Sequence, residues 1–194
     1  MSSHLLYLHG FRSSPQSFKA QRLQAWLAEH RPGVHWWCPQ LPPSPRAALD
    51  LLREGTASWP GTTSAVLGSS LGGFYATVVA EERGWPAVLM NPTVEPARDL
   101  AAYVGELSAF HSPEERFFFR CEYVDELRAM RPAAITRPER YFAVIAKGDK
   151  VLDWREMTAR YPGVHLRLLD GSDHALADFD DHLAHILTFL QLSS

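Results

Sequence analysis

The chain has 194 residues, of which 46% are hydrophobic and 21% are charged, so it is long enough to bury a full hydrophobic core. We predict one domain over 1–194, with an insertion at about 93–137. The net charge of −3 comes from 19 basic and 22 acidic residues without a basic block, which argues against a nucleic acid or an anionic membrane surface as partner.

The two cysteines, Cys38 and Cys121, lie far apart and outside any metal-ligand spacing. They indicate free thiols in a reducing compartment rather than a disulfide framework. The start of the chain lacks the basic segment and long apolar stretch of a secretory signal, and no apolar run is long enough to span a bilayer. We therefore expect a cytoplasmic protein without an integral membrane segment, and the sequence leaves its oligomeric state open.

Short apolar runs alternate with helical periodicity along most of the chain. Six runs predict buried strands, at 5–8, 34–38, 65–67, 87–90, 141–146 and 164–169. Helical spacing follows the first three runs, and a final amphipathic segment carries Leu176, Phe179, Leu183, Ile186, Leu187 and Leu190 on one face. This alternation predicts an α/β fold, in which helices cover both faces of a six-stranded, mostly parallel sheet.

The alternation breaks between Thr93 and about Arg137. This segment lacks strand signals, contains three consecutive phenylalanines at 117–119, and has apolar residues at helical spacing around Leu127. We interpret it as a helical insertion that lies over the end of the sheet as a lid.

Residues 67–73, Leu-Gly-Ser-Ser-Leu-Gly-Gly, join the third predicted strand to the following helix. With Ser70 at the centre they form Gly-x-Ser-x-Gly between a strand and a helix, which is the context of a nucleophile elbow. Such a turn leaves no room for a Cβ two residues before and two residues after the serine, and Gly68 and Gly72 meet this demand. Ser69 fails the same test because leucines would flank it. A glycine-rich turn between packed elements is the alternative for the motif alone.

A serine hydroxyl needs a base to remove its proton and an acid to orient that base. Of the nine histidines, only His174 lies in the loop between the last strand and the last helix, from which an imidazole can reach the elbow. An exposed residue at the entry of the helix is the alternative interpretation of His174.

For the acid we favour Asp149, which directly follows the fifth predicted strand, where reactive groups of a parallel sheet gather. A turn-forming Gly-Asp pair is the structural alternative, and Glu95, after the fourth strand, is the rival acid. Asp153 is a candidate cap of the next helix. The chain order Ser70, Asp149, His174 is the order of an α/β-hydrolase triad.

The oxyanion formed on attack needs backbone donors. We expect them to be the amide of Leu71, at the start of the helix, and the amide of Phe11, in the loop after the first strand. His9 is expected to hydrogen-bond within that loop rather than to act as base. We expect no metal and no cofactor, because His182 and His185 fit an ordinary amphipathic helix and no glycine-rich loop fits a phosphate cradle better than the elbow fits a serine hydrolase.

The chain resembles the YqiA-like esterases, small bacterial α/β-hydrolases, nearly from end to end. The shared motifs are Leu6-Tyr7-Leu8-His9-Gly10-Phe11 with Ser13-Ser14-Pro15, Gly68-Ser69-Ser70-Leu71-Gly72-Gly73-Phe74-Tyr75-Ala76, Met90-Asn91-Pro92, Gly148-Asp149-Lys150-Val151-Leu152-Asp153 and Asp173-His174-Ala175. The resemblance implies a reduced α/β-hydrolase fold and hydrolysis of carboxylic esters or thioesters by Ser70, Asp149 and His174. The chain departs from the family pattern at Asp173, where we expect asparagine.

We therefore expect a serine esterase or thioesterase that acts on small or acyl-chain substrates. An amidase or peptidase is the alternative among enzymes, because a triad does not decide the leaving group. A non-catalytic ligand- or partner-binding protein with this fold is the alternative outside them. We also expect Phe117 to Phe119 or Tyr123 to wall an acyl pocket, unless these aromatics only dock the insertion onto the body. The acyl group and the leaving group stay open.

Overall fold

The computed structural model describes residues 1–193. It contains a six-stranded parallel sheet in the order β2-β1-β3-β4-β7-β8, which confirms the predicted sheet. The strands are β1 (His4–Leu8), β2 (His35–Trp37), β3 (Ser64–Ser69), β4 (Ala87–Met90), β7 (Tyr141–Ala146) and β8 (His165–Leu169). The register pairs Ser69 with Met90 and Ala146 with Leu169, so the loops that follow these strands start at one edge of the sheet.

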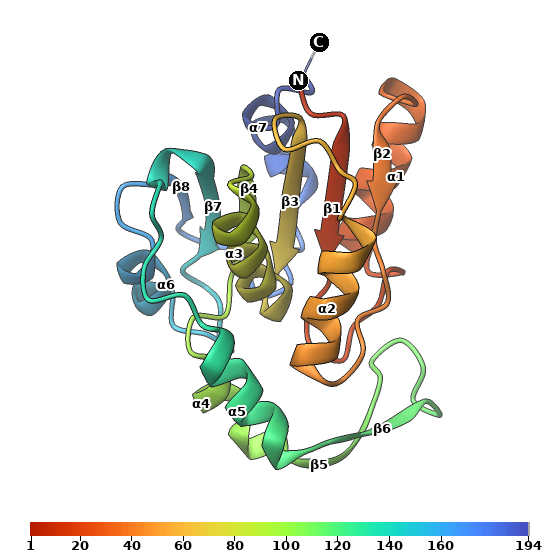
Figure 1. Ribbon diagram of the computed structural model, residues 1–194. Helices are drawn as coiled ribbons and strands as arrows, with labels where there is room; N and C mark the ends of the chain where they lie inside the picture. Colours follow the sequence, from red (N-terminus) through yellow and green to blue (C-terminus); the bar gives the residue numbers. More distant parts are fainter. Residues whose placement is uncertain (194) are drawn as a thin grey trace.

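Helices cover both faces of the sheet, with α2 and α3 in front and α1 and α7 behind in the view of Figure 1. The helices that pack on the sheet are α1 (Phe18–His30), α2 (Pro45–Gly55), α3 (Leu71–Arg83), α6 (Trp154–Arg160) and α7 (Asp180–Phe189). Successive side chains of a strand point to opposite faces. Leu6 and Leu8 therefore pack with α2, α3 and α6, whereas Leu5 and Tyr7 pack with α1 and α7. Burial on both faces explains why the strands read as continuous apolar runs.

Between β4 and β7, residues 96–130 lie beyond the carboxyl ends of the strands, where we predicted the insertion, and the chain then runs back to the amino end of β7 (Figure 1). It forms α4 (Pro96–Leu100), the short 3-10 helices η1 (Ala101–Tyr103) and η2 (Pro138–Arg140), strands β5 (Gly105–Ser108) and β6 (Arg116–Phe119), and α5 (Cys121–Met130). The two strands pair with each other in an antiparallel hairpin.

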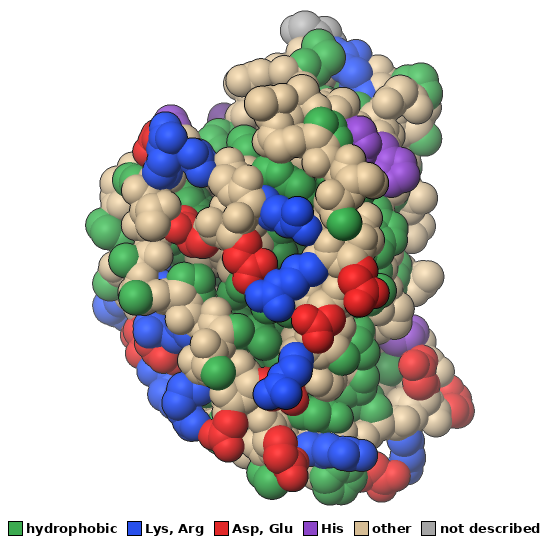
Figure 2. Space-filling model, in the orientation of Figure 1, with side chains coloured by type: hydrophobic (Ala, Val, Ile, Leu, Met, Phe, Trp, Pro, Cys, Tyr) green, Lys and Arg blue, Asp and Glu red, His purple; other side chains and the backbone are tan. Residues whose placement is uncertain are grey.

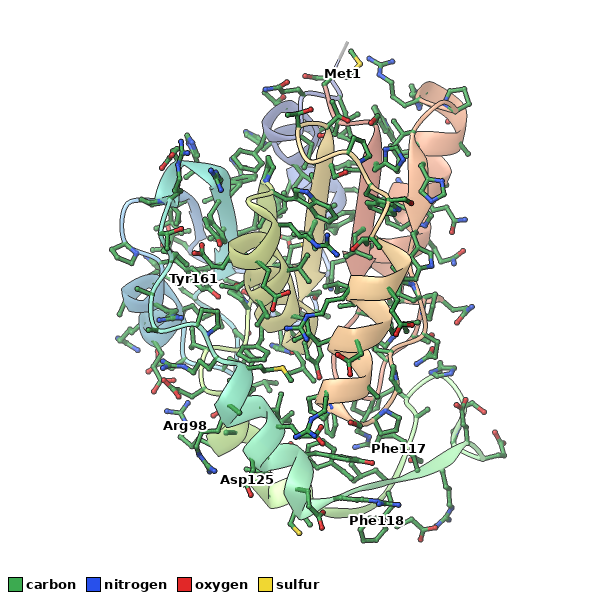
Figure 3. The ribbon with its side chains drawn as sticks, in the orientation of Figure 1. Met1, Arg98, Phe117, Phe118, Asp125 and Tyr161 are labelled. Atoms are coloured by element: carbon green, nitrogen blue, oxygen red, sulfur yellow. The ribbon has the colours of Figure 1, made fainter. Side chains whose placement is uncertain are left out.

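The prediction that this segment lacks strands is wrong. Each strand has only four residues. In β6, exposed and buried positions alternate, but three of the four residues are phenylalanines, so the sequence does not show this alternation. Phe118 is 58% exposed, whereas Phe119 is only 1% exposed. Figure 3 shows Phe117 on the side of β6 that faces the sheet and Phe118 on the opposite side.

The last helix starts later than the sequence predicts. It begins at Asp180, so Leu176 and Phe179 precede it, but both are buried in the same core as Leu183 and Ile186. A non-helical segment therefore extends the apolar face of the helix, because burial rather than helical periodicity selects the side chains.

The described part of the molecule has a mixed charge distribution on the face that carries α2 and α3, where acidic and basic side chains are interspersed (Figure 2). Arg53 on α2, for example, lies 2.6 Å from Glu82 on α3. Cys38 and Cys121 are both free thiols. Among residues 1–193, no helix has the length and apolar character needed to cross a membrane.

Candidate active site

Ser70 occupies the turn between β3 and α3, and its backbone has φ of 56° and ψ of −122°. A positive φ is strained for a residue with a side chain, and such strain at an exposed serine is a feature of a nucleophile elbow. A Cβ on Gly68 would lie 2.0 Å from the carbonyl oxygen of Gly72, and one on Gly72 would lie 1.9 Å from that of Leu8. Strand, helix and neighbouring strand therefore approach each other so closely that only glycine fits at these two positions.

Backbone hydrogen bonds hold Ser70 against the end of β4 and the loop that follows it. Its amide donates to the carbonyl of Met90 at 3.0 Å, and its own carbonyl accepts from the amide of Thr93 at 3.0 Å. Ser69, by contrast, is the last residue of β3 and is buried. The turn thus presents Ser70, and not Ser69, at its tip.

His174 lies between Ser70 and Asp149. Its Nε2 is 3.1 Å from Ser70 Oγ, and its Nδ1 is 2.6 Å from Asp149 Oδ2. A neutral imidazole in this arrangement donates from Nδ1 to the carboxylate and accepts the serine proton at Nε2. The structure therefore brings together the three side chains that the sequence singled out, from the loops after β3, β7 and β8.

The Asp149 side chain is fully buried, and its other oxygen is also occupied. Asp149 Oδ1 accepts from the amides of Val151 at 2.7 Å and Leu152 at 2.9 Å. Burial raises the pKa of Asp149, but the hydrogen bonds from His174 and from these two amides outweigh it, so its pKa lies below the ordinary value. Asp149 is consequently ionised and oriented toward the imidazole.

The other two acids have different partners. Asp153 is the N-cap of α6, where its Oδ1 accepts from the amide of Arg155 at 2.8 Å. Glu95 precedes α4 and pairs with Arg131, which also donates to the carbonyl of Val94 at 3.2 Å. Neither carboxylate contacts His174 in the described part of the chain.

The loop after β1 packs directly against the serine. A Cβ on Gly10 would lie 3.3 Å from Ser70 Cβ. Within residues 1–193, neither the amide of Phe11 nor the amide of Leu71 donates a hydrogen bond to another group. An oxyanion needs N–H donors that are not engaged elsewhere, and both amides meet this condition.

His9 has the role within the loop that we predicted. Its Nδ1 donates to the carbonyl of Gly10 at 3.0 Å, and its Nε2 accepts from the amide of Leu41 at 3.1 Å. Burial lowers the pKa of His9, which favours the neutral ring that these two bonds need. His9 thereby ties the loop after β1 to the proline-rich loop after β2.

The sequence predicts no chemical role for Asn91, although its side chain links the loop that carries His174 to the end of β7, where the Asp149 loop starts. It is fully buried and follows β4 with φ of 41°. Its Nδ2 donates to the carbonyls of Asp173 at 2.9 Å and His174 at 3.1 Å, while its Oδ1 accepts from the amide of Ala146 at 2.8 Å. A polar amide directly after a buried strand was the signal that could have identified this residue.

A cavity of about 330 Å³ lies beside the elbow. It is bounded by the loops after β1 and β2, the first turns of α3 and the hairpin of the 93–137 segment. Most of its wall is apolar, and the aromatic and aliphatic side chains in it include Phe11, Leu41, Leu71, Tyr75, Phe117 and Phe119. Tyr123 does not line the cavity but packs against Phe119 at 5.5 Å between ring centroids.

Solved structures with the same fold cover nearly the whole chain. Est1E from Butyrivibrio proteoclasticus, with ferulic acid bound, is 16% identical with a TM-score of 0.73, and the match covers 97% of this chain and 88% of Est1E. One of the metagenome-derived lipolytic enzymes LipS and LipT is 18% identical with a TM-score of 0.71 over 99% of this chain and 95% of its own. The Pyrococcus furiosus esterase Pf2001 is 16% identical with a TM-score of 0.63 over 98% and 81%. These likenesses show that the fold is that of the α/β-hydrolases.

Residues 4–191 match the family described as "Uncharacterised protein family (UPF0227)". This match spans the elbow, the loops of Asp149 and His174, and the 93–137 segment. The chain therefore belongs to this family, that of the YqiA-like esterases.

Proposed function

We propose that the protein is a serine hydrolase that cleaves carboxylic esters or thioesters through an acyl-enzyme formed on Ser70. The proposal rests on one observation, the hydrogen-bonded series from Ser70 Oγ through His174 to Asp149 at a strained strand-to-helix turn. The presence of lipolytic enzymes and an esterase among proteins of the same fold supports this class of reaction.

In the first step, His174 Nε2 removes the proton of Ser70 as Ser70 Oγ attacks the carbonyl carbon. Asp149 stabilises the imidazolium that forms and keeps the ring in the correct orientation. The amides of Leu71 and Phe11 donate to the oxyanion of the tetrahedral intermediate.

In the second step, the intermediate collapses and the bond to the alcohol or thiol breaks. His174 returns its proton to the leaving atom, and the acyl group stays on Ser70. Water, activated by the same imidazole, then attacks the acyl-enzyme and releases the carboxylic acid.

A substrate comparison tests this proposal. We would measure kcat/KM for a p-nitrophenyl ester, an acyl thioester and a p-nitroanilide that share one short acyl group. We expect turnover of the ester and the thioester and much slower turnover of the amide. Preference for the anilide would indicate an amidase, and absence of turnover of all three would indicate a binding protein.

A further inference from the structure

The cavity beside the elbow lies on the acyl side of the proposed reaction. The carbon of the tetrahedral intermediate carries four groups: Ser70 Oγ, the oxyanion, the leaving atom and the acyl group. The leaving atom must face His174 Nε2 to receive its proton, and the oxyanion must face the amides of Leu71 and Phe11. Because Leu71 and Phe11 line the cavity and His174 does not, the cavity is positioned for the acyl group. This step rests on the proposed function.

The size and walls of the cavity favour a compact acyl group. Its volume of about 330 Å³ is at the lower end of the range for ligand sites, about 300–1,000 Å³. The aromatic rings of its wall support one another, since Phe11 lies 5.2 Å from Phe119 and 6.3 Å from Phe117, both edge to face. A packed wall of this kind resists expansion for a long chain.

Two buried polar side chains line the cavity, His9 and Tyr75. His9 uses both ring nitrogens in hydrogen bonds to the protein. The Tyr75 side chain is only 3% exposed and lines the cavity, and within residues 1–193 its hydroxyl makes no hydrogen bond, although the hydroxyl oxygen itself is not fully enclosed by protein. A hydroxyl that has no partner in the protein and is still accessible from an otherwise buried side chain is free to donate to a ligand in the cavity.

The position of Tyr75 fixes which part of the acyl group it meets. Tyr75 follows Leu71 by four residues on α3, so it lies on the same side of the helix, about 6 Å further along its axis. Burial, and to a smaller degree the carboxylate of Glu126, raise the pKa of Tyr75, so its hydroxyl keeps the proton that it donates. Glu126 itself accepts from Ser44 Oγ and the amide of Arg46, each at 2.9 Å.

We propose that the cavity accepts a compact acyl group that carries a hydrogen-bond-accepting oxygen several bonds from the ester carbonyl, and that the Tyr75 hydroxyl donates to this oxygen. Tyr75 is then a specificity-determining residue, and the substrate class is that of oxygen-substituted acyl esters rather than plain fatty acyl esters.

Pairs of p-nitrophenyl esters test this proposal. In each pair, one methylene of a short acyl chain is replaced by a ketone, at successive positions along the chain. For each enzyme we would take the ratio of kcat/KM between the oxo ester and the plain ester. Tyr75→Phe should lower this ratio about three- to tenfold at the matching position, the usual effect of one neutral hydrogen bond. Because the wild type and Tyr75→Phe are tested on the same pair of esters, the difference in intrinsic reactivity between the two esters cancels when their ratios are compared.

Tyr7→Phe is the matched control, because the Tyr7 hydroxyl likewise has no hydrogen-bond partner among the described residues but lies in the opposite core, away from the cavity. Its ratios should equal those of the wild type. If p-nitrophenyl acetate is hydrolysed but no position gives a ratio that depends on Tyr75, the role of Tyr75 is refuted and the proposed function stands. If the wild type hydrolyses none of the esters, both proposals are refuted together.

Discussion

The two sides of the candidate site are built differently. On the triad side, direct hydrogen bonds join the loops after β3, β7 and β8, and the amide of Asn91 ties the loop after β8 to the end of β7. On the cavity side, the loop after β1 meets a hairpin through packed aromatic rings. Directional bonds fix reacting atoms to within fractions of an ångström, whereas apolar walls fix only a shape. Substitutions on the first side should therefore change kcat, and substitutions on the second should change the preference among acyl groups.

The largest effect is expected at the serine. Ser70→Ala should lower kcat on the order of a million-fold, because it removes the nucleophile of the triad. Ser69→Ala should be far milder, since Ser69 belongs to the buried strand. Steady-state kinetics on both purified variants would check this contrast, and an inactive Ser69→Ala enzyme would mean that the register of the elbow is wrong.

The second largest loss of activity is expected at Asp149. Asp149→Asn should lower kcat on the order of 10⁴-fold, because an amide neither stabilises the imidazolium nor holds the required tautomer. Asp153→Asn is the control in the same loop: asparagine also caps helices, so its activity should be close to that of the wild type. Equal losses in the two variants would argue against a specific role of Asp149.

Asn91 tests whether the bonds between the loops matter. Asn91→Ala removes three hydrogen bonds and should lower kcat about a hundredfold through misplacement of His174, with KM nearly unchanged. Thermal melting should be measured alongside. A variant with a lower Tm and an unchanged kcat would show that Asn91 supports the fold alone.

The aromatic wall should give a smaller effect of a different kind. Phe117→Ala should change the ratio of kcat/KM between short and longer acyl chains on the order of tenfold, because Phe117 lines the cavity. Phe118→Ala is the matched control, since Phe118 is on the exposed side of β6. Identical ratios in both variants would place acyl selectivity elsewhere.

The smallest effect concerns stability in acid. The pKa of Asp149 is lowered in the folded chain, so its contribution is present above the unfolded-state pKa of about 3.9 and is lost as the pH falls through the lower folded value. The difference in unfolding free energy between the wild type and Asp149→Asn should therefore shrink as the pH falls below about 4. Urea titrations over this range measure it, and a constant difference would contradict the assignment.

The triad side could be predicted largely from the sequence, for a physical reason. Buried parallel strands appear as apolar runs, and their carboxyl ends share one edge, so the elbow motif and chain position together predict that Ser70, Asp149 and His174 lie in loops at that edge. The register of the elbow followed from steric demands at Gly68 and Gly72, which are local. The role of Asn91 could not be predicted in this way, because it depends on which loops meet across the sheet.

The cavity side could not be predicted in the same way. The strands β5 and β6 have four residues each and form a separate two-stranded sheet, so the sequence carries too little periodicity to identify them. The contacts of Phe11 with Phe117 and Phe119 join residues about a hundred positions apart. The burial of Tyr75 beside the cavity likewise depends on side chains that are distant in the sequence.

The most direct measurement is the site and rate of labelling by a fluorophosphonate, which reacts with an activated serine. We predict one adduct per chain, mapped by peptide mass spectrometry to Ser70, and a strongly reduced labelling rate in His174→Ala. An adduct on another residue, or equally fast labelling of Ser70 without His174, would contradict the assignment of Ser70 and His174 as nucleophile and base.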